Sequence, residues 1–142
     1  MSLSQFARWI GGIGQNVDPL TTQIVKEMVH EMAPVLVKAT PVDTGRARSN
    51  WQGAVNNIPQ GILYYPAPLA PSSASDGTAE GIQSINDAAN AYKGRGYIAI
   101  ANNVPYIGVL NTGSSSQAPA GFVEDAVLAG IMSLNGKSIL VP

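Results

Sequence analysis

The feature that most constrains the fold is a long apolar stripe in the first third of the chain. Apolar side chains recur there in steps of three and four, which places them on one face of a helix: Leu20, Ile24, Val25, Met28, Val29, Met32, Val35 and Leu36. Asp18 and Pro19 are typical of a helix start, because aspartate can accept a free backbone N–H and proline lacks one. Other elements must cover this stripe.

Pro34 lies inside the stripe, where it removes one backbone hydrogen bond. We therefore expect a bend near Glu31, with the helix resuming to about Ala39. The helix should end at Thr40, because a residue that precedes proline is driven out of the helical region.

A turn is predicted directly after this helix. It contains Pro41, Asp43, Thr44 and Gly45. Asp43 can bond to its own backbone, and Gly45 can adopt a positive φ.

Three segments have the pattern of strands. Residues 49–55 alternate in a way that turns Trp51 inward, and residues 61–65 could form a short hairpin partner. Residues 97–103 carry apolar side chains on both faces, which indicates a central or covered strand.

Further helices are indicated in the second half. Asp76 can cap a helix that runs to Tyr92 and ends at Gly94 and Gly96, and residues 106–110 could form one helical turn. Pro119 is expected to open the last helix. Its predicted buried side comprises Phe122, Val123, Ala126, Val127, Ile131 and Leu134.

These elements predict an α+β fold, in which a small, mostly antiparallel β-sheet is packed by a long N-terminal helix and a C-terminal helix. A length of 142 residues favours a single domain over 1–142. Within it we expect a flexible N-terminal segment at 1–17, an extended loop at 66–77 and a C-terminal tail at 137–142.

Composition narrows the function. Only 12% of the residues are charged, against about 25% in typical soluble domains, so self-association is expected. The formal net charge of -1 supplies no basic field for nucleic acid. With no cysteine and one histidine, disulfides, thiol catalysis and the usual zinc sites are excluded, and no cofactor is expected.

Transport signals are also missing from the sequence. No apolar run approaches the about 20 residues that span a bilayer, and the first residues do not resemble a signal peptide. The expected place of synthesis is the cytoplasm, without membrane contact, unless a larger assembly carries the protein elsewhere.

Four cations occupy two short turn segments: Arg46, Arg48, Lys93 and Arg95. They could contact phosphate or the carboxylates of a neighbouring subunit, or could simply be solvated. His30 is expected to be a solvated surface residue. Glu27 and Glu31 share one helix face, and such pairs are far more common on exposed helices than in catalytic sites.

Both chain ends carry candidate interface residues. Phe6 and Trp9 give the first ten residues aromatic bulk at helical spacing; this segment could pack in the core, but docking on another subunit is the preferred interpretation. Ile139, Leu140 and Val141 form an apolar, β-prone tail that could extend its own sheet or that of a neighbour.

Three elements in order carry a resemblance to a known family. Residues 40–51 (TPVDTGRARSNW), 97–106 (YIAIANNVPY) and 113–123 (GSSSQAPAGFV) resemble the signature of the minor tail protein Z-like group of tailed bacteriophages, which are tail-completion and neck proteins. The matched region extends from about Asp18 to Leu134. One departure is Asn111, where many relatives place an acidic residue.

The resemblance implies a structural virion protein and not an enzyme. It implies a homo-oligomeric ring, often six-fold, at the head-proximal end of the tail, where the ring completes the tail and joins it to the head. Implied partners are other neck, adaptor, connector or tail proteins, with possible non-specific contact to genomic DNA in the channel through Arg46 and Arg48.

Three alternatives remain open. A tail terminator or tail tube-associated protein would share ring symmetry but would contact tube subunits. A hydrolase is a remote alternative, because no constellation of nucleophile, base and orienting group is visible. A sequence-specific DNA-binding module lacks the basic recognition helix that it would need.

Overall fold

The computed structural model describes residues 19–42, 45–64, 76–113, 116 and 118–134. Its elements are α2 (Pro19–Ala39), α3 (Arg46–Ser49), β1 (Gln52–Val55), α4 (Thr78–Ala91), β2 (Ile98–Ala101), α5 (Ile107–Asn111) and α6 (Phe122–Met132). The α+β prediction is confirmed, with a two-stranded antiparallel sheet, a long helix near the N-terminus and a C-terminal helix that packs on it.

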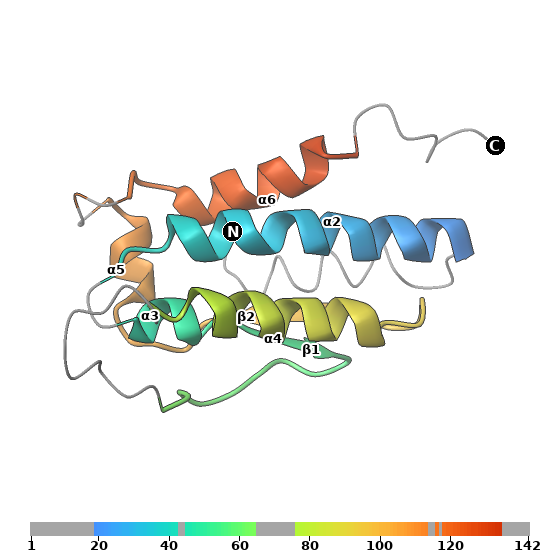
Figure 1. The fold of residues 1–142 in the computed structure, drawn as a ribbon, viewed down its shortest axis with the longest axis horizontal. Coiled ribbons are helices and arrows are strands. Elements are labelled where there is room, and N and C mark those ends of the chain that lie inside the picture. The colour runs from blue at the N-terminus through green and yellow to red at the C-terminus, as the bar shows by residue number, and fades with distance from the viewer. Residues whose placement is uncertain (1–18, 43–44, 65–75, 114–115, 117, 135–142) are drawn as a thin grey trace.

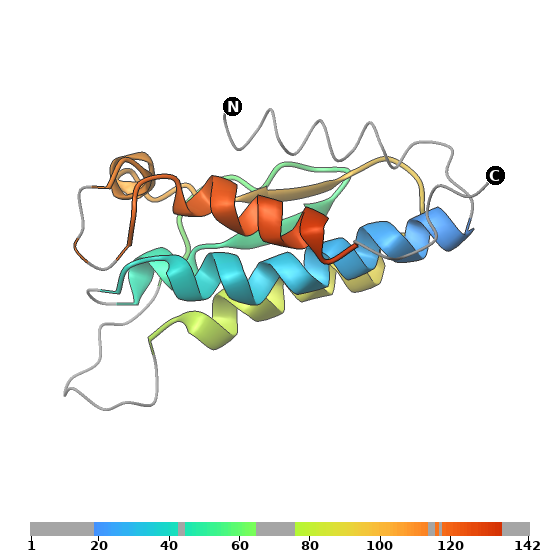
Figure 2. The same ribbon diagram turned by 90° about the horizontal axis from the view of Figure 1, so that it is seen from above.

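The helices form one layer and the strands another. In Figure 1, α6, α2 and α4 lie side by side, with α2 in the middle, and α2 packs against both neighbours. Figure 2 shows the two strands on one side of this helical layer. Helix α4 joins the layers, because it packs on α2 and also on β1.

Helix α2 runs from Pro19 to Ala39 without interruption through Pro34, so the helix does not stop near Glu31 and resume after it as expected. The lost backbone bond costs about 3 kcal/mol in a regular helix. Burial of apolar side chains on both sides of the proline, including Val29 and Leu36, outweighs that cost where α2 packs between α4 and α6.

The strand predicted at 49–55 begins later than expected. Residues 46–49 form the short helix α3, and only Gln52–Val55 pair with β2, with Gln52 opposite Ala101 and Val55 opposite Ile98. Gly45 has a φ of 86°. This conformation turns the chain directly into α3, and strand geometry can start only after that helix.

The predicted hairpin partner of β1 is also wrong for residues 61–64, which form no strand. Its place is taken by β2. The 61–64 segment is attached through a side chain, because Asn50 Oδ1 accepts a hydrogen bond from the Leu63 amide at 2.7 Å and Asn50 Nδ2 donates to the Leu63 carbonyl at 3.2 Å. The Asn50 side chain thus binds both the amide and the carbonyl of Leu63, as the backbone of a neighbouring strand would.

Two helix starts differ from expectation. The N-cap of α4 is Gly77, with a φ of 83°, and not Asp76. Asp76 precedes the N-cap, and its Oδ1 accepts a hydrogen bond from the Thr78 amide at 3.0 Å. Helix α6 begins at Phe122 and not at Pro119, because Gly121 has a φ of 77° and interrupts the path. The short helix predicted near 106–110 is confirmed as α5.

The core lies between α2, α4, α6 and the sheet. Its largest fully buried side chains include Trp51, Tyr92, Phe122 and Met32. On α6 the buried residues are Phe122, Val123, Ala126 and Gly130, whereas Ile131, predicted to be buried, is 37% exposed. Within the described residues, no helix has the length and apolar content needed to cross a lipid bilayer.

Candidate functional site

The guanidinium of Arg48 binds its own chain on several sides. Nε donates to the Thr40 carbonyl and Nη2 to the Lys38 carbonyl, both at 2.8 Å. Nη1 donates to Asp76 Oδ2 at 2.8 Å and to Thr78 Oγ1 at 3.0 Å. Arg48 therefore joins the C-terminal end of α2 to the N-terminal end of α4. The free carbonyls at the end of α2 favour a cation there.

Asp76 is held in its charged form at this junction. Its pKa lies below the usual carboxyl value because the Thr78 hydroxyl and the Thr78 amide donate to it, and because Arg48 is close; partial burial opposes these effects. The Arg48 and Asp76 side chains are 17% and 49% exposed. The ion pair is thus partly screened by water.

Other polar residues of the 40–51 motif also bind inward. Trp51 Nε1 donates to Thr40 Oγ1 at 2.8 Å, and Thr40 Oγ1 donates to the Leu36 carbonyl at 2.9 Å. Asn102 Nδ2 reaches the Ala47 carbonyl at 2.8 Å from the end of β2. Within the described residues, the motif fastens α2, α3, α4 and the sheet together.

The donors of Arg48 serve intrachain acceptors at the junction of α2 and α4. Its contact with a neighbouring subunit or a DNA channel stays a prediction. Arg46 is exposed on α3. Pro41 is buried and Gly45 has the predicted positive φ, while Asp43 and Thr44 lie outside the described residues.

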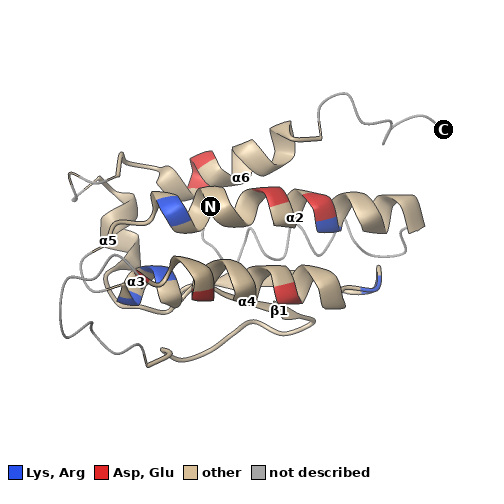
Figure 3. Cartoon of the chain, viewed as in Figure 1, with Lys and Arg blue, Asp and Glu red and all other residues tan. Residues whose placement is uncertain are grey.

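The second basic pair lies far from the first. Lys93 and Arg95 are exposed and follow the C-terminal end of α4, whereas Arg46 lies near its N-terminal end. Helix α4 has 14 residues, which corresponds to a length of about 21 Å at about 1.5 Å per residue. Figure 3 shows the blue segments at the two ends of this helix, so the structure does not gather them into one basic site.

Asn111 has a defined role at the start of α6. Its Oδ1 accepts from the Val123 amide at 2.9 Å, and its Nδ2 donates to both carboxylate oxygens of Glu124, at 3.1 and 2.9 Å. An acidic residue at position 111 would repel Glu124. The asparagine at position 111, which departs from the phage signature, therefore suits Glu124, whose carboxylate needs a donor at this place.

His30 is not the solvated residue that the sequence suggested. Its Nδ1 lies 2.9 Å from Asn86 Oδ1 and its Nε2 lies 3.0 Å from Asn90 Oδ1. Both asparagines are on α4, one turn apart. The imidazole thus links α2 to α4, a role that only the packing of these two helices reveals.

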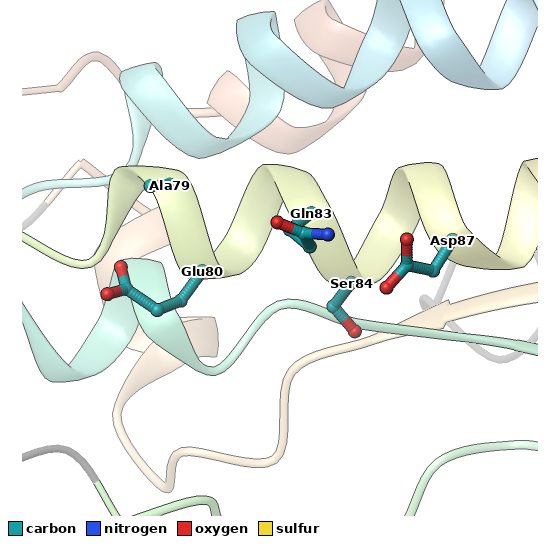
Figure 4. Close-up of a pocket in the computed structure, with 5 residues that line it drawn as sticks. All are labelled: Ala79, Glu80, Gln83, Ser84 and Asp87. Carbon is teal, nitrogen blue, oxygen red and sulfur yellow. The ribbon is translucent and has the colours of Figure 1, made fainter.

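A shallow hollow lies along α4 (Figure 4). It has a volume of about 360 Å³ and is lined by Ala79, Glu80, Gln83, Ser84 and Asp87, all from that helix. Ser84 Oγ accepts from the Gly53 amide at 3.1 Å, so it already serves the fold. No three His, Cys, Asp or Glu side chains among the described residues cluster as metal ligands would.

Among the described residues, six of the ten exposed large apolar side chains fall into two groups that sequence reasoning did not identify, and the other four, Leu20, Val35, Tyr106 and Val109, lie on α2 and at α5. On α6, Leu128, Ile131 and Met132 are 53%, 37% and 62% exposed; we call them the α6 patch. After β1, Ile62, Leu63 and Tyr64 are 42%, 47% and 90% exposed; we call them the post-β1 patch. Spacings of three and four place the α6 residues on one helix face.

The candidate interface residues at the chain ends, Phe6, Trp9, Ile139, Leu140 and Val141, lie outside the described residues. No known protein family matches the sequence, and neither the curated proteins nor the solved structures contain a match to the chain.

Proposed function

We propose that this protein is a structural component of a tailed-bacteriophage virion. It forms a homo-oligomeric ring in the neck, where it completes the tail and joins it to the head. Its partners are neighbouring neck or tail proteins, and its work is mechanical: the ring holds because each subunit buries apolar surface against the next, worth about 25 cal/mol per Å².

The observation that carries the proposal is the presence of two apolar patches on different sides of one subunit. In Figure 1, α6 lies along one edge of the molecule and residues 61–64 along the opposite edge, with α2 and α4 between them. When two different surfaces of identical subunits meet head to tail, the contacts are heterologous, and they generate a ring if the rotation closes.

The sequence resemblance supports the same proposal. Its three elements occur in the order of the phage signature, and the first one, residues 40–51, fastens four elements of the fold rather than forming a reactive site. A motif that holds the fold together is what we expect of a structural protein that acts through its surface contacts. The alternative of a tail terminator shares the ring and differs in its partner.

Complementary variants test the ring. Leu128→Asp with Met132→Asp removes the α6 patch, and Leu63→Asp with Tyr64→Asp removes the post-β1 patch. Native mass spectrometry should show rings for the unmodified chain, monomers for each variant alone, and heterodimers for their mixture, since one intact interface remains between them. Gln83→Asp, on the exposed face of α4, is the matched control and should leave the rings intact.

Monomers in the mixture would contradict a head-to-tail ring, because a single self-complementary patch cannot be rescued in this way. The place in the virion is tested separately. Mixing the ring with purified head-connector or tail-tube proteins should give a larger complex with the connector. A complex with tube protein alone would favour the terminator, and absence of the chain from mature particles would reject the virion role.

A further inference from the structure

The segment that follows β1 is attached to the domain as a strand would be. Asn50 Oδ1 accepts from the Leu63 amide at 2.7 Å, and Asn50 Nδ2 donates to the Leu63 carbonyl at 3.2 Å. In strand geometry, the amide and the carbonyl of one residue point to the same side, and those of the next residue point to the opposite side. The backbone groups of Ile62 and Tyr64 therefore face away from Asn50.

This side of residues 62–64, which we call the outer edge, is open. Within the described part of the chain, Ile62 and Tyr64 make no backbone hydrogen bond. Their side chains are exposed together with that of Leu63, and residues 60–64 carry no charge. An exposed edge with free donors and acceptors is a template on which another extended segment can add.

We propose that the C-terminal tail of a neighbouring subunit adds to the outer edge as a strand, through residues 138–141. The inference rests on the proposed ring, in which the α6 patch of one subunit meets the post-β1 patch of the next. The tail follows α6 directly in the sequence, so the same contact brings it close to the outer edge. Main-chain hydrogen bonds then connect it to Ile62 and Tyr64.

The composition of the tail suits an added strand. Ile139 and Val141 are β-branched, which favours strand geometry. Within residues 135–142, Lys137 is the only charged residue, and proline occurs only at the last position. Residues 65–75, which continue directly from the outer edge, contain three prolines and therefore lack three of the N–H donors that pairing requires.

The tail of the same chain is too short to supply this strand. In Figure 1, α6 and residues 61–64 lie along opposite edges of the molecule, with α2 and α4 between them. Packed helices lie about 8–10 Å apart, so α4 is about 16–20 Å from α6, and the outer edge lies beyond it. The residues from Leu134 to Ile139 span at most about 18 Å when fully extended. A neighbouring subunit is therefore the source.

Pairing over so few residues is weak by itself. In the ring, α6 holds the tail beside the outer edge, and such a tether gives an effective concentration on the order of millimolar. The tail thus strengthens an interface that the two apolar patches form. It does not hold a ring together when the α6 patch is removed.

A synthetic peptide with the sequence of residues 135–142 tests the proposal. The receptor is a full-length chain that forms no ring and cannot use its own tail. Leu128→Asp with Met132→Asp removes the α6 patch, and Ile139→Asp with Val141→Asp disables the tail. The outer edge of this chain keeps its natural sequence.

Nuclear magnetic resonance of the isotope-labelled receptor reports binding at single amides. As peptide is added, the amide signals of Ile62 and Tyr64 should shift downfield and reach saturation, because their N–H groups gain hydrogen bonds. The Gln83 amide, on the exposed face of α4, is the control and should not shift. Absence of saturable shifts at Ile62 and Tyr64 would overturn the proposal.

Two methylated peptides separate strand pairing from side-chain contact. One carries N-methyl groups at Ile139 and Val141, and the other carries them at Ser138 and Leu140. An added strand directs alternate amides to the edge, so only one of these peptides should lose affinity, by about tenfold or more. Equal binding of both peptides, or an equal loss in both, would overturn strand addition.

Failure of this inference is distinguishable from failure of the proposed ring. Rings of the unmodified chain, together with a peptide that does not bind, would leave the ring standing and overturn strand addition. Monomers of the unmodified chain, together with saturable peptide binding, would reject the ring and support the outer edge as a surface that accepts a strand.

Discussion

At the scale of single residues, the ion pair of Arg48 and Asp76 connects the ends of two helices. Arg48 satisfies two carbonyls at the end of α2 and reaches Asp76 and Thr78 at the start of α4. Without the Arg48 side chain, the Thr40 and Lys38 carbonyls would lose a charged hydrogen-bond donor at a partly buried position. The intrachain role of this side chain is therefore to hold the end of α2 against the start of α4.

Replacement of Arg48 by methionine should lower the free energy of unfolding by about 2–3 kcal/mol, as expected for hydrogen bonds to a charged group. Arg48→Lys should recover only part of this loss, because an ammonium cannot bond in the directions of a planar guanidinium. Urea unfolding measures both. Arg95→Met, at an exposed position in the turn after α4, is the control and should change stability by less than about 0.5 kcal/mol.

The stability contributed by Asp76 should depend on pH in the acid range. Its folded-state pKa is lowered, first by the Thr78 hydroxyl, so it lies below the unfolded value of about 3.9. The carboxylate therefore adds stability that is complete above about pH 5 and is lost as the pH falls through the folded pKa. The stability difference between the natural chain and Asp76→Asn should be constant near neutrality and shrink below about pH 4. A difference that grows on acidification would contradict this assignment.

At the scale of elements, close approach between helices and strands depends on positions without side chains. A Cβ on Gly53 would lie 2.9 Å from the Ser84 carbonyl oxygen and 3.0 Å from Ile85 Cα, both backbone atoms of α4. A Cβ on Gly130 would lie 3.1 Å from the Met28 carbonyl oxygen. These two glycines set how near β1 and α6 come to their neighbouring helices.

Gly53→Ala should therefore destabilise the protein by about 1–3 kcal/mol, the usual cost of overpacking against atoms that cannot yield. Gly108→Ala is the matched comparison, because it lies in α5 with open space around its Cβ position. It should stabilise the chain by up to about 1 kcal/mol through helix propensity. Thermal unfolding of the two variants should thus shift in opposite directions; equal shifts would show that β1 is not held this closely.

At the scale of the whole molecule, the described surface carries apolar patches at two edges and charges of both signs on α2 and α4 between them. Only 12% of the residues are charged, and the exposed cations of α3 and of the turn after α4 lie at opposite ends of one helix. Long-range electrostatic attraction is therefore a weak source of association. Burial of the α6 and post-β1 patches is the stronger one.

Self-association should consequently resist salt. Between about 0.1 and 0.5 M sodium chloride, the charge interactions of an exposed surface are largely screened, whereas apolar burial is not weakened. Sedimentation velocity should show an unchanged or larger assembled fraction at the higher salt concentration. A substantial loss of assembly would point instead to ion pairs, with Arg46, Lys93 and Arg95 as the first residues to substitute.

The sequence by itself determined the α+β class, α2 from Pro19 to Ala39, the positive φ of Gly45 and the existence of β2. Each of these follows from local periodicity or from the conformational preference of one residue, and both can be read along the chain. The inward side of Trp51 was also predictable, although its place before β1 was not.

Only the tertiary structure decided which residues meet across large sequence separations. Arg48 lies 28 residues before Asp76, His30 lies 56 residues before Asn86, and β1 pairs with β2 rather than with the segment that follows it. Whether a cation, an imidazole or a strand edge faces solvent depends on what packing places beside it. Packing energies are sums over distant partners, so no local pattern contains them.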